Sequence, residues 1–521
     1  MTLMTIRHKL VSNTTYLSLN WVSVTVFSLG FWLLLGKTLS PSSYGVVSVS
    51  LQVATFLSGV AALGLTGAIN KLVAEFLERK QMDKVQGIIM FSFKSVIAAS
   101  LLIAVALAAM SGTLAPLLKM PVNVLMLTAA SVTIISTTTL FDFIYYGFQR
   151  MKKQFATNFI GGVSKIAFAA AFIFLGLDYV GATLALVLSY LVILVSRLER
   201  RMFSLSAHPI VDRASITKFA VPAFVVFVCV TVFTGSQYVM LSAMKSTEEA
   251  GLMSVAMQVP SVINTVSVIF YLALGSIVSG LSANRNPKPM QSYLVKLVFR
   301  YDLFIMVPMT AFMIVLSKYA VLFFASPQYL PAANLMMIMA AATAVYGLCG
   351  LLLSSMYSMG RPNEYMKIEI GVAALYMLLA VPLTYYFSAT GMAVAYLLSN
   401  LAFFAVGMLC LRKYLDFAMP LADIGRIAAA TAISVALLAA ATPYIRGSVV
   451  AIAAAVLACG IYMVVMLPMR FYIKEDLAVL DVVMEKVPIT KAPVTAVRNI
   501  VAKFVDRSYN ETSFGSARRP G

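Results

Sequence analysis

Charged side chains are scarce in this sequence of 521 residues. They make up 11% of the chain, hydrophobic residues make up 61%, and the mean hydropathy is +0.91. A soluble domain carries about 25% charged residues, so a soluble fold of this length is excluded. In lipid, only helices and closed barrels satisfy the backbone. The apolar runs are about 20 residues long without strict alternation, which suits spanning helices. The sequence therefore predicts an all-α integral membrane protein.

Cysteine, histidine and outward-facing acidic residues are also rare. The four cysteines all fall inside apolar runs and the two histidines are far apart, so neither a disulfide framework nor a metal site is expected. Predicted outer loops offer little beyond Asp178, Glu248 and Glu249, too few for a pair of catalytic carboxylates. We expect no enzyme, no catalytic residues and no cofactor. A membrane glycosyltransferase or glycan polymerase is the remote alternative.

The apolar runs predict about fourteen transmembrane helices. A stretch after Lys318 is ambiguous between a re-entrant segment and the end of the ninth helix. The predicted spans are 15–36, 43–68, 87–112, 122–147, 156–176, 180–198, 216–240, 250–280, 297–317, 332–357, 365–387, 389–410, 426–443 and 448–468.

The net charge of +19 resides mainly in short loops between these runs. This is the pattern of membrane-helix flanks, so we expect no nucleic-acid partner. With the N-terminus inside, 23 Lys and Arg fall in inner loops before the tail and five in outer loops, which predicts cytoplasmic N- and C-termini in the cell (inner) membrane. The outer five are Lys37, Lys119, Lys245, Lys318 and Arg446.

Two segments of the chain repeat. GVVSVSLQV at 45–53 aligns with GLMSVAMQV at 251–259, and GATLALVLSYL at 181–191 aligns with GMAVAYLLSNL at 391–401. The copies stand six helices apart, so both halves face the same way, as in transporters built from parallel repeats. We predict two pseudo-symmetric six-helix lobes around a central cavity, 1–205 and 206–415, and an appended helix pair at 416–468.

The tail at 469–521 differs in character. Residues 494–507 read VTAVRNIVAKFVDR and place Val497, Ile500, Val501 and Phe504 on one helical face. This predicts a cytoplasmic tail with an interfacial amphipathic helix on anionic lipid.

Several segments resemble a known family. LGKTLSPSSYG at 35–45, Gly64-Leu65, Glu249-Ala250-Gly251, PQYLPAA at 327–333 and Gly360-Arg361-Pro362 are similar to motifs of the polysaccharide-transporter family, the O-antigen or lipid-linked oligosaccharide flippases. That family lies in the multidrug/oligosaccharidyl-lipid/polysaccharide exporter superfamily. The resemblance spans roughly residues 10–412. One departure is Ser236-Gln237, which stands where many members carry a hydrophobic-Asp pair.

The resemblance implies a flippase that moves a polyprenyl-diphosphate-linked oligosaccharide from the cytoplasmic to the outer leaflet. The partners that the resemblance implies are the glycan, membrane lipids and a glycan polymerase or glycosyltransferases, with H⁺ or Na⁺ coupling left open. The nearer alternative is a cation-coupled multidrug exporter of the same superfamily.

Polar groups within spans are costly and are candidates for the cavity. Lys165 is the first candidate, because a cation there would attract a diphosphate; snorkelling to the surface is the other reading. Lys94 favours snorkelling. Asp142 would pair with Lys165 or Lys94, or respond to protonation; a structural ion pair is the other reading. Gln52 and its repeat equivalent Gln258 would bind sugar hydroxyls, or pack between helices.

Weaker candidates complete the predicted set. Asn20 and Asn400 are further cavity candidates. Arg300, Asp302 and Arg361 are inner-gate candidates, with a plain positive-inside anchor as the alternative reading.

Overall fold

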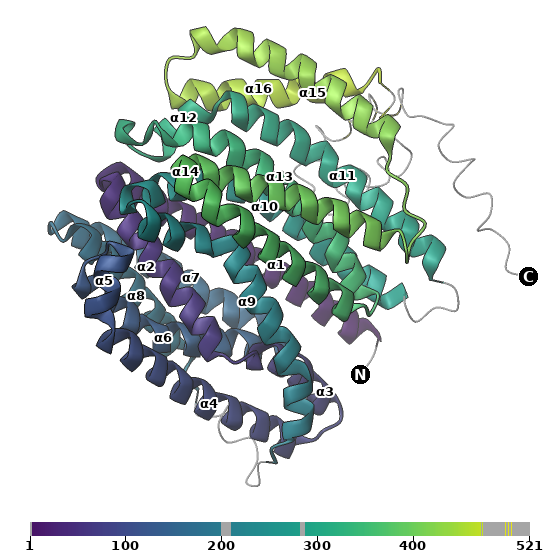
Figure 1. The fold of residues 1–521 in the computed structure, drawn as a ribbon. Coiled ribbons are helices and arrows are strands. Elements are labelled where there is room, and N and C mark those ends of the chain that lie inside the picture. Colours follow the sequence, from purple (N-terminus) through teal and green to yellow (C-terminus); the bar gives the residue numbers. More distant parts are fainter. Residues whose placement is uncertain are drawn as a thin grey trace, which may run out of the picture. The chain divides into compact units, whose positions relative to one another are not determined.

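The computed structural model describes residues 3–199, 210–281, 287–469 and 471–472 and the single positions 495, 499 and 502. The predicted interfacial helix at 494–507 lies almost wholly outside these residues. The described chain is helical throughout, without strands, which confirms the all-α prediction (Figure 1). Its helices are α1 (Leu3–Thr38), α2 (Pro41–Ala61), α3 (Leu65–Glu78), α4 (Met82–Ala109), α5 (Ser111–Leu118), α6 (Val122–Gly147), α7 (Met151–Phe174), α8 (Asp178–Arg197), α9 (Arg213–Met244), α10 (Thr247–Leu281), α11 (Lys288–Val315), α12 (Ser317–Phe324), η2 (Pro327–Tyr329), α13 (Ala332–Ser358), α14 (Pro362–Leu411), α15 (Leu421–Ala441), η3 (Thr442–Tyr444) and α16 (Ser448–Met466).

Thirteen of the described helices are long and apolar enough to cross a membrane. Helix α14 has 50 residues, about twice the length that a bilayer needs, and its backbone leaves the helical region at Ser388 (φ 54°, ψ −138°). This break falls between the spans predicted at 365–387 and 389–410. The thirteen helices therefore correspond to about fourteen spans, with α14 counted twice.

In two places the structure has additional short helices that the apolar pattern did not separate. The run predicted at 43–68 divides into α2 and α3, because Leu63 and Gly64 take positive φ values of 51° and 69°. The ambiguous stretch after Lys318 forms α12 and then the 3₁₀ turn η2.

Local sequence explains where two central helices begin. The side chain of Ser40 accepts the Ser43 N–H at 3.2 Å and Pro41 holds the first helical position of α2. Asp212 caps α9 in the same way, accepting the N–H and the hydroxyl of Ser215. These two hydrogen bonds hold the pKa of the Asp212 carboxyl below its ordinary value.

The chain divides into two compact units. Unit 1 holds residues 1–262, 321–342 and 362–403, and unit 2 holds 263–320, 343–361 and 404–521. The predicted lobes at 1–205 and 206–415 and the appended pair at 416–468 stay a prediction.

Within unit 1, α2 lies among several helices. It packs against α1, α4, α6, α8 and α9, and α3 continues the contact with α6 and α9. A buried cluster joins α3, α4 and α6 and includes Ile69, Val73, Phe93, Phe141 and Ile144. These side chains are buried away from both lipid and water and form a packed core in unit 1.

Within unit 2, α15 and α16 pack on α11 and on each other. Arg300 of α11 is almost wholly buried, and its Nε lies 3.0 Å from Oδ2 of Asp423 on α15. The Tyr462 hydroxyl of α16 donates to the Phe304 carbonyl of α11 at 3.0 Å. A buried ion pair and an aromatic anchor thus hold the helix pair to α11.

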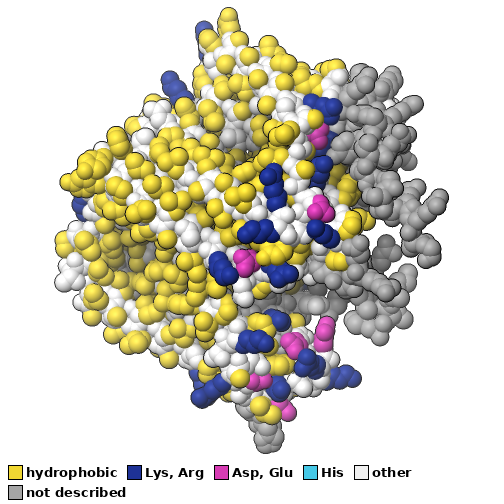
Figure 2. Space-filling model, turned by 45° about the vertical axis from the view of Figure 1, so that its right-hand side comes forward, with side chains coloured by type: hydrophobic (Ala, Val, Ile, Leu, Met, Phe, Trp, Pro, Cys, Tyr) yellow, Lys and Arg dark blue, Asp and Glu magenta, His cyan; other side chains and the backbone are white. Residues whose placement is uncertain are grey.

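Hydrophobic side chains cover most of the surface in view, and charged side chains gather in clusters (Figure 2). Large apolar side chains such as Leu102, Phe174 and Tyr386 are strongly exposed. An apolar surface of this extent fits contact with lipid rather than with water.

We predict that Asp423→Ala destabilises the protein by about 3–5 kcal/mol, because it leaves the buried Arg300 without its counter-charge. The double variant Asp423→Ala/Arg300→Met should recover most of that loss, since both charges are then gone. Thermal unfolding of the purified protein in detergent measures both. The matched control is Asp416→Ala, whose pair with Lys288 is exposed and worth about 0–1 kcal/mol. Equal losses for Asp423→Ala and Asp416→Ala would contradict the anchor.

Candidate functional site

The first turns of α2 and α10 cross at very short range. A Cβ at Gly45 would clash with the carbonyl oxygen of Thr247, and a Cβ at Gly251 would clash with the carbonyl oxygen of Pro41. These four residues form two pairs with the same spacing of 206 as the repeat. The crossing is therefore reciprocal, and only glycine lets the two backbones approach so closely.

Two hydrogen bonds, one of them between further repeat equivalents, link the helices at this crossing. The Ser48 hydroxyl donates to the Ser254 hydroxyl at 2.9 Å, and both side chains are buried. The hydroxyls of Ser42 and Thr247 lie 2.8 Å apart. We call the crossing of Gly45, Ser48, Gly251 and Ser254 the helix-start contact.

A second pair of equivalents flanks the helix-start contact. Asp178 and Ser388 both adopt positive φ, 45° and 54°, at the matching break before α8 and within α14. Ser43 donates to the Asp178 carboxylate at 2.8 Å, while Glu249 accepts the Ala389 N–H at 3.2 Å. Ser43 and Glu249 are themselves repeat equivalents. Each half thus joins this position to the break before or within the later helix, through Asp178 in one half and through Ala389, which follows Ser388, in the other.

Two of the motifs that carry the family resemblance meet in unit 1. The side chains of Gln328 and Tyr329 both donate to the Leu39 carbonyl at 3.0 Å. Lys37 Nζ donates to the Leu322 and Ala325 carbonyls at 2.7 and 3.1 Å and so caps the end of α12. The motifs at 35–45 and 327–333 are therefore hydrogen-bonded to each other beside the helix-start contact.

A buried polar network centres on Arg197 at the end of α8. Its guanidinium, fully buried, donates to Asp142 Oδ1 at 2.8 Å, Asn158 Oδ1 at 2.6 Å and the Thr138 carbonyl at 2.7 Å. Its Nε donates to the Thr157 hydroxyl at 3.1 Å. From the sequence, Arg197 is one of the basic residues that flank a predicted span. It lies 55 residues from Asp142, so the sequence gives no sign that the two side chains pair.

This network shows that the predicted ion-pair partners of Asp142 are wrong, and it also includes Asn20. Asp142 pairs with Arg197 and not with Lys165 or Lys94, and it also accepts the Gln154 side-chain amide at 2.9 Å. Asn20 of α1 accepts the Asn158 amide at 2.9 Å, so Asn20 and Asp142 belong to one network across α1, α6, α7 and α8.

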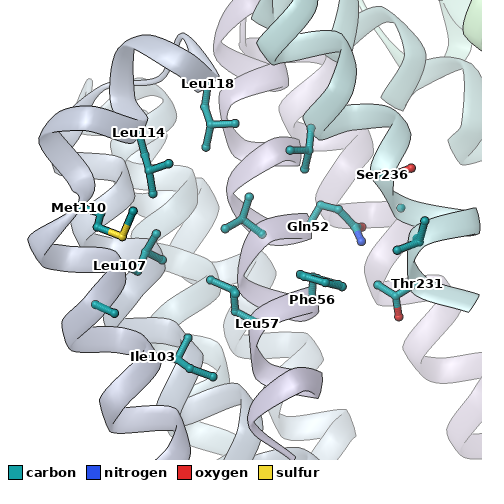
Figure 3. A pocket seen from close by; sticks show the side chains of 15 residues that line it. Gln52, Phe56, Leu57, Ile103, Leu107, Met110, Leu114, Leu118, Thr231 and Ser236 are labelled. Carbon is teal, nitrogen blue, oxygen red and sulfur yellow. The ribbon is translucent and has the colours of Figure 1, made fainter. Parts of the chain in front are cut away.

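A cavity of about 440 Å³ lies between α2, α4, α5 and α9 (Figure 3). Its lining is almost entirely hydrocarbon, from side chains such as Leu57, Ile103, Leu107 and Leu114. The predicted cavity residue Gln52 lies in its wall, with its amide against Gly235 of α9, where a Cβ would clash with it. Thr231 and Ser236 of α9 complete the polar edge.

The other cavity candidates lie apart from this site. Lys165 of α7 places its Nζ 5.3 Å from the centre of the Phe31 ring, and no described carboxylate forms an ion pair with it. Lys94 is exposed on α4, as a snorkelling lysine would be. Gln258 is half-buried on α10. Asn400 is buried and donates to the Tyr396 carbonyl of its own helix at 2.9 Å.

The inner-gate candidates all fall in unit 2. Arg300 is held by Asp423, as described above. Asp302 is fully buried and accepts the Ser267 hydroxyl at 2.8 and 2.9 Å through its two oxygens. Arg361 precedes α14 and lies 4.9 Å from the ring centre of Tyr414. Whether these residues act as a gate stays a prediction.

Comparison with protein families gives one match. The family described as polysaccharide biosynthesis protein matches residues 10–278, which is more than half of the chain. No curated protein matches the sequence.

Comparison with solved structures gives the same fold repeatedly. The chain resembles the lipid II flippase MurJ in an inward closed conformation, with a TM-score of 0.67 at 13% identity over 87% of this chain and 98% of that one. It resembles an inward-facing multidrug resistance MATE family transporter of the MOP superfamily, with a TM-score of 0.64 at 13% identity over 77% and 97%. A MOP superfamily transporter from Pyrococcus furiosus matches at 0.53 and 13%, over 78% and 96%. At these identities the likeness establishes the fold.

We predict that Ser48→Cys and Ser254→Cys, introduced together in a variant lacking the four native cysteines, form a disulfide in high yield. The two hydroxyl oxygens are already 2.9 Å apart, within reach of a disulfide's side-chain geometry. Non-reducing electrophoresis after mild oxidation, with a protease site between the cysteines, measures the yield.

The matched control for this prediction is Ser50→Cys with Ser254→Cys. Ser50 bonds to Thr128 of α6 at 2.7 Å and so faces away from α10. Similar cross-linking of both pairs would show that the helix-start contact is not as described.

Proposed function

This chain belongs to the polysaccharide biosynthesis protein family, and we propose that it moves a polyprenyl-diphosphate-linked oligosaccharide from the cytoplasmic to the outer leaflet of the cell membrane. The family match over residues 10–278 is the observation that carries the proposal. The glycan would serve the assembly of a cell-surface polysaccharide or of glycoprotein glycans. The fold shared with the lipid II flippase MurJ supports a lipid-linked substrate.

The physical need for such a protein is clear. A diphosphate and a chain of sugars cannot enter hydrocarbon without losing their hydration, which costs several kcal/mol for each unpaired polar group. The polyprenyl tail is already soluble in the bilayer. A flippase therefore has to shield the polar part along a protein path, whereas the tail needs no shielding from lipid.

The reciprocal helix-start contact supports alternating access as the mechanism. Equivalent residues of the two halves meet at one end of α2 and α10, through two backbone approaches and the Ser48–Ser254 hydrogen bond. In lipid, close packing of small residues and hydrogen bonds between helices are what hold helices together, so this contact would stabilise a state in which this end of the two helices is closed. Opening it while the other end closes would pass the head group across.

Lys165 is the proposed contact to the diphosphate. Its ammonium group has no described carboxylate as an ion-pair partner, whereas the buried Arg197 and Arg300 are both neutralised. A cation without a protein counter-ion within a span is available to an anionic substrate. The proposal assigns no chemical step to the chain. Coupling to H⁺ or Na⁺ is left open.

A cation-coupled multidrug exporter is the second candidate, because the fold also matches a multidrug resistance MATE family transporter. The two candidates differ in the charge of their cargo. A lipid-linked diphosphate is anionic, and drugs of that class are organic cations.

We predict that the protein, reconstituted in liposomes, moves a fluorescent polyprenyl-diphosphate oligosaccharide between leaflets, and that Lys165→Ala slows this about tenfold. The expected loss follows from one charge-assisted hydrogen bond of about 1.5 kcal/mol. Lys94→Ala is the matched control, since Lys94 is also an intramembrane lysine but is exposed on α4. Uptake of organic cations without any glycan movement would favour the drug exporter instead. An equal effect of both substitutions would remove Lys165 from the substrate path.

We further propose that the protein lies in the cell (inner) membrane with both termini in the cytoplasm, close to the glycosyltransferases or polymerase that handle the same glycan. The predicted orientation places Lys119 outside and Lys152 inside, and both side chains are exposed. In intact cells, a membrane-impermeant maleimide should label Lys119→Cys directly and Lys152→Cys only after permeabilisation. The reverse pattern would invert the topology and the direction of transport.

A further inference from the structure

The cavity between α2, α4, α5 and α9 is a large apolar cleft that is open on one side. Its volume of about 440 Å³ leaves room for part of a bound molecule. Ordered water needs two to four polar partners, which the aliphatic wall of Ile103, Leu107 and Leu114 does not provide. Its natural occupant is therefore hydrocarbon.

The cavity has an exposed apolar rim. Ala106 of α4 and Met110, which directly follows α4, line the cavity and are exposed, Met110 to 52%. The neighbouring α4 side chains Leu102 and Val105 are more exposed still and point out of the helix bundle. Since α4 is a membrane-spanning helix, an exposed apolar stripe along it lies against lipid chains. A chain can therefore enter from the bilayer without crossing water.

The opposite edge of the cavity is polar. The Gln52 amide has no hydrogen-bond partner among the described residues and fills the notch at Gly235. Figure 3 shows Gln52 and Phe56 turned toward α9, which contributes Thr231 and Ser236, while Leu57 and the side chains of α4 and α5 form the hydrocarbon wall. The site thus has an apolar body and one edge with an unused amide, a shape that suits an amphiphile more than a plain hydrocarbon.

We propose that this cavity binds the isoprenoid chain of a polyprenyl-diphosphate glycan, with the isoprene unit nearest the diphosphate at the Gln52 edge. The proposal rests on the proposed function, since it takes its ligand from there. Gln52 is also the repeat residue that sequence reasoning placed on the substrate path. Anchoring of the tail in α2, α4 and α9 holds the substrate to the protein while its head group moves.

The test is photo-crosslinking in liposomes that contain the full-length protein. One probe is a polyprenyl-diphosphate oligosaccharide with a diazirine on the isoprene next to the diphosphate. The other is a phosphatidylglycerol with a diazirine on one acyl chain. Mass spectrometry of digested protein locates the labels. The isoprenoid probe should label Gln52 and the α9 residues Thr231 and Ser236 that lie at the same edge, and excess unlabelled polyprenyl-diphosphate glycan should remove that label.

Two variants fill the cavity and one serves as the control. Leu107→Trp fills the buried wall, and Ala106→Phe fills the exposed mouth, where a larger side chain is easily accommodated. Each should lower labelling by the isoprenoid probe at least fivefold. Leu102→Trp is the matched control, because Leu102 is 73% exposed on the same helix and does not line the cavity. It should change labelling less than twofold.

The outcomes separate this site from the proposed function. Equal labelling of the cavity by the phospholipid probe, undiminished by excess polyprenyl glycan, would overturn the proposal and leave a site for ordinary bilayer lipid. Absence of label from both probes would also overturn it, and in either case flipping by the same liposomes would keep the function. Competed labelling without any glycan flipping would support the site and reject the flippase.

Discussion

The close crossing of α2 and α10 at Gly45 and Gly251 is the constraint on which unit 1 depends. Because neither position can hold a Cβ, the two backbones come near enough for Ser48 and Ser254 to bond directly. The direction of α2 is then fixed, and one side of it lies against α9. There the missing side chain at Gly59 leaves room for the Phe227 ring, and the missing side chain at Gly235 leaves room for the Gln52 amide. The other side of α2, with α4 and α5, encloses the apolar cavity.

Charge within the spans follows a second rule, that a buried ion needs a partner. Arg197 takes Asp142 within unit 1, and Arg300 takes Asp423 within unit 2. Each pair ties a helix end into its unit and has little freedom to meet a substrate. Lys165 differs from these two arginines, because the contact described for its ammonium group is with the Phe31 ring. This difference is the reason for proposing Lys165 as the contact to an anionic substrate.

Much of the architecture could be predicted from the sequence. Hydropathy gave the spans, including the division of α14 near Ser388, because the length of an apolar run is a local property. The order of weak motifs gave the family, which the match over 10–278 confirms. The repeat alignment singled out Ser48 and Ser254, which prove to be in contact.

The site was less predictable, for a physical reason. Pairs such as Arg197–Asp142 and Arg300–Asp423 join helices far apart in the chain, and no periodicity encodes which helices are neighbours. Arg197 looked like a loop anchor, since a basic residue at the end of a span is usually one. Apart from Gln52, the cavity left no signal in the sequence, because most of its lining residues are as apolar as the lipid-facing ones.

The two links beside the helix-start contact make different demands on positions 43 and 249, although these are equivalent in the repeat. The Ser43 hydroxyl donates a hydrogen bond to the Asp178 carboxylate, while the Glu249 carboxylate accepts one from the Ala389 N–H. A glutamate at position 43 would place a carboxylate against Asp178, and two like charges at hydrogen-bonding distance repel each other. The start of α10 put in place of the start of α2 would therefore lose this hydrogen bond, so the two copies of the repeat are no longer interchangeable.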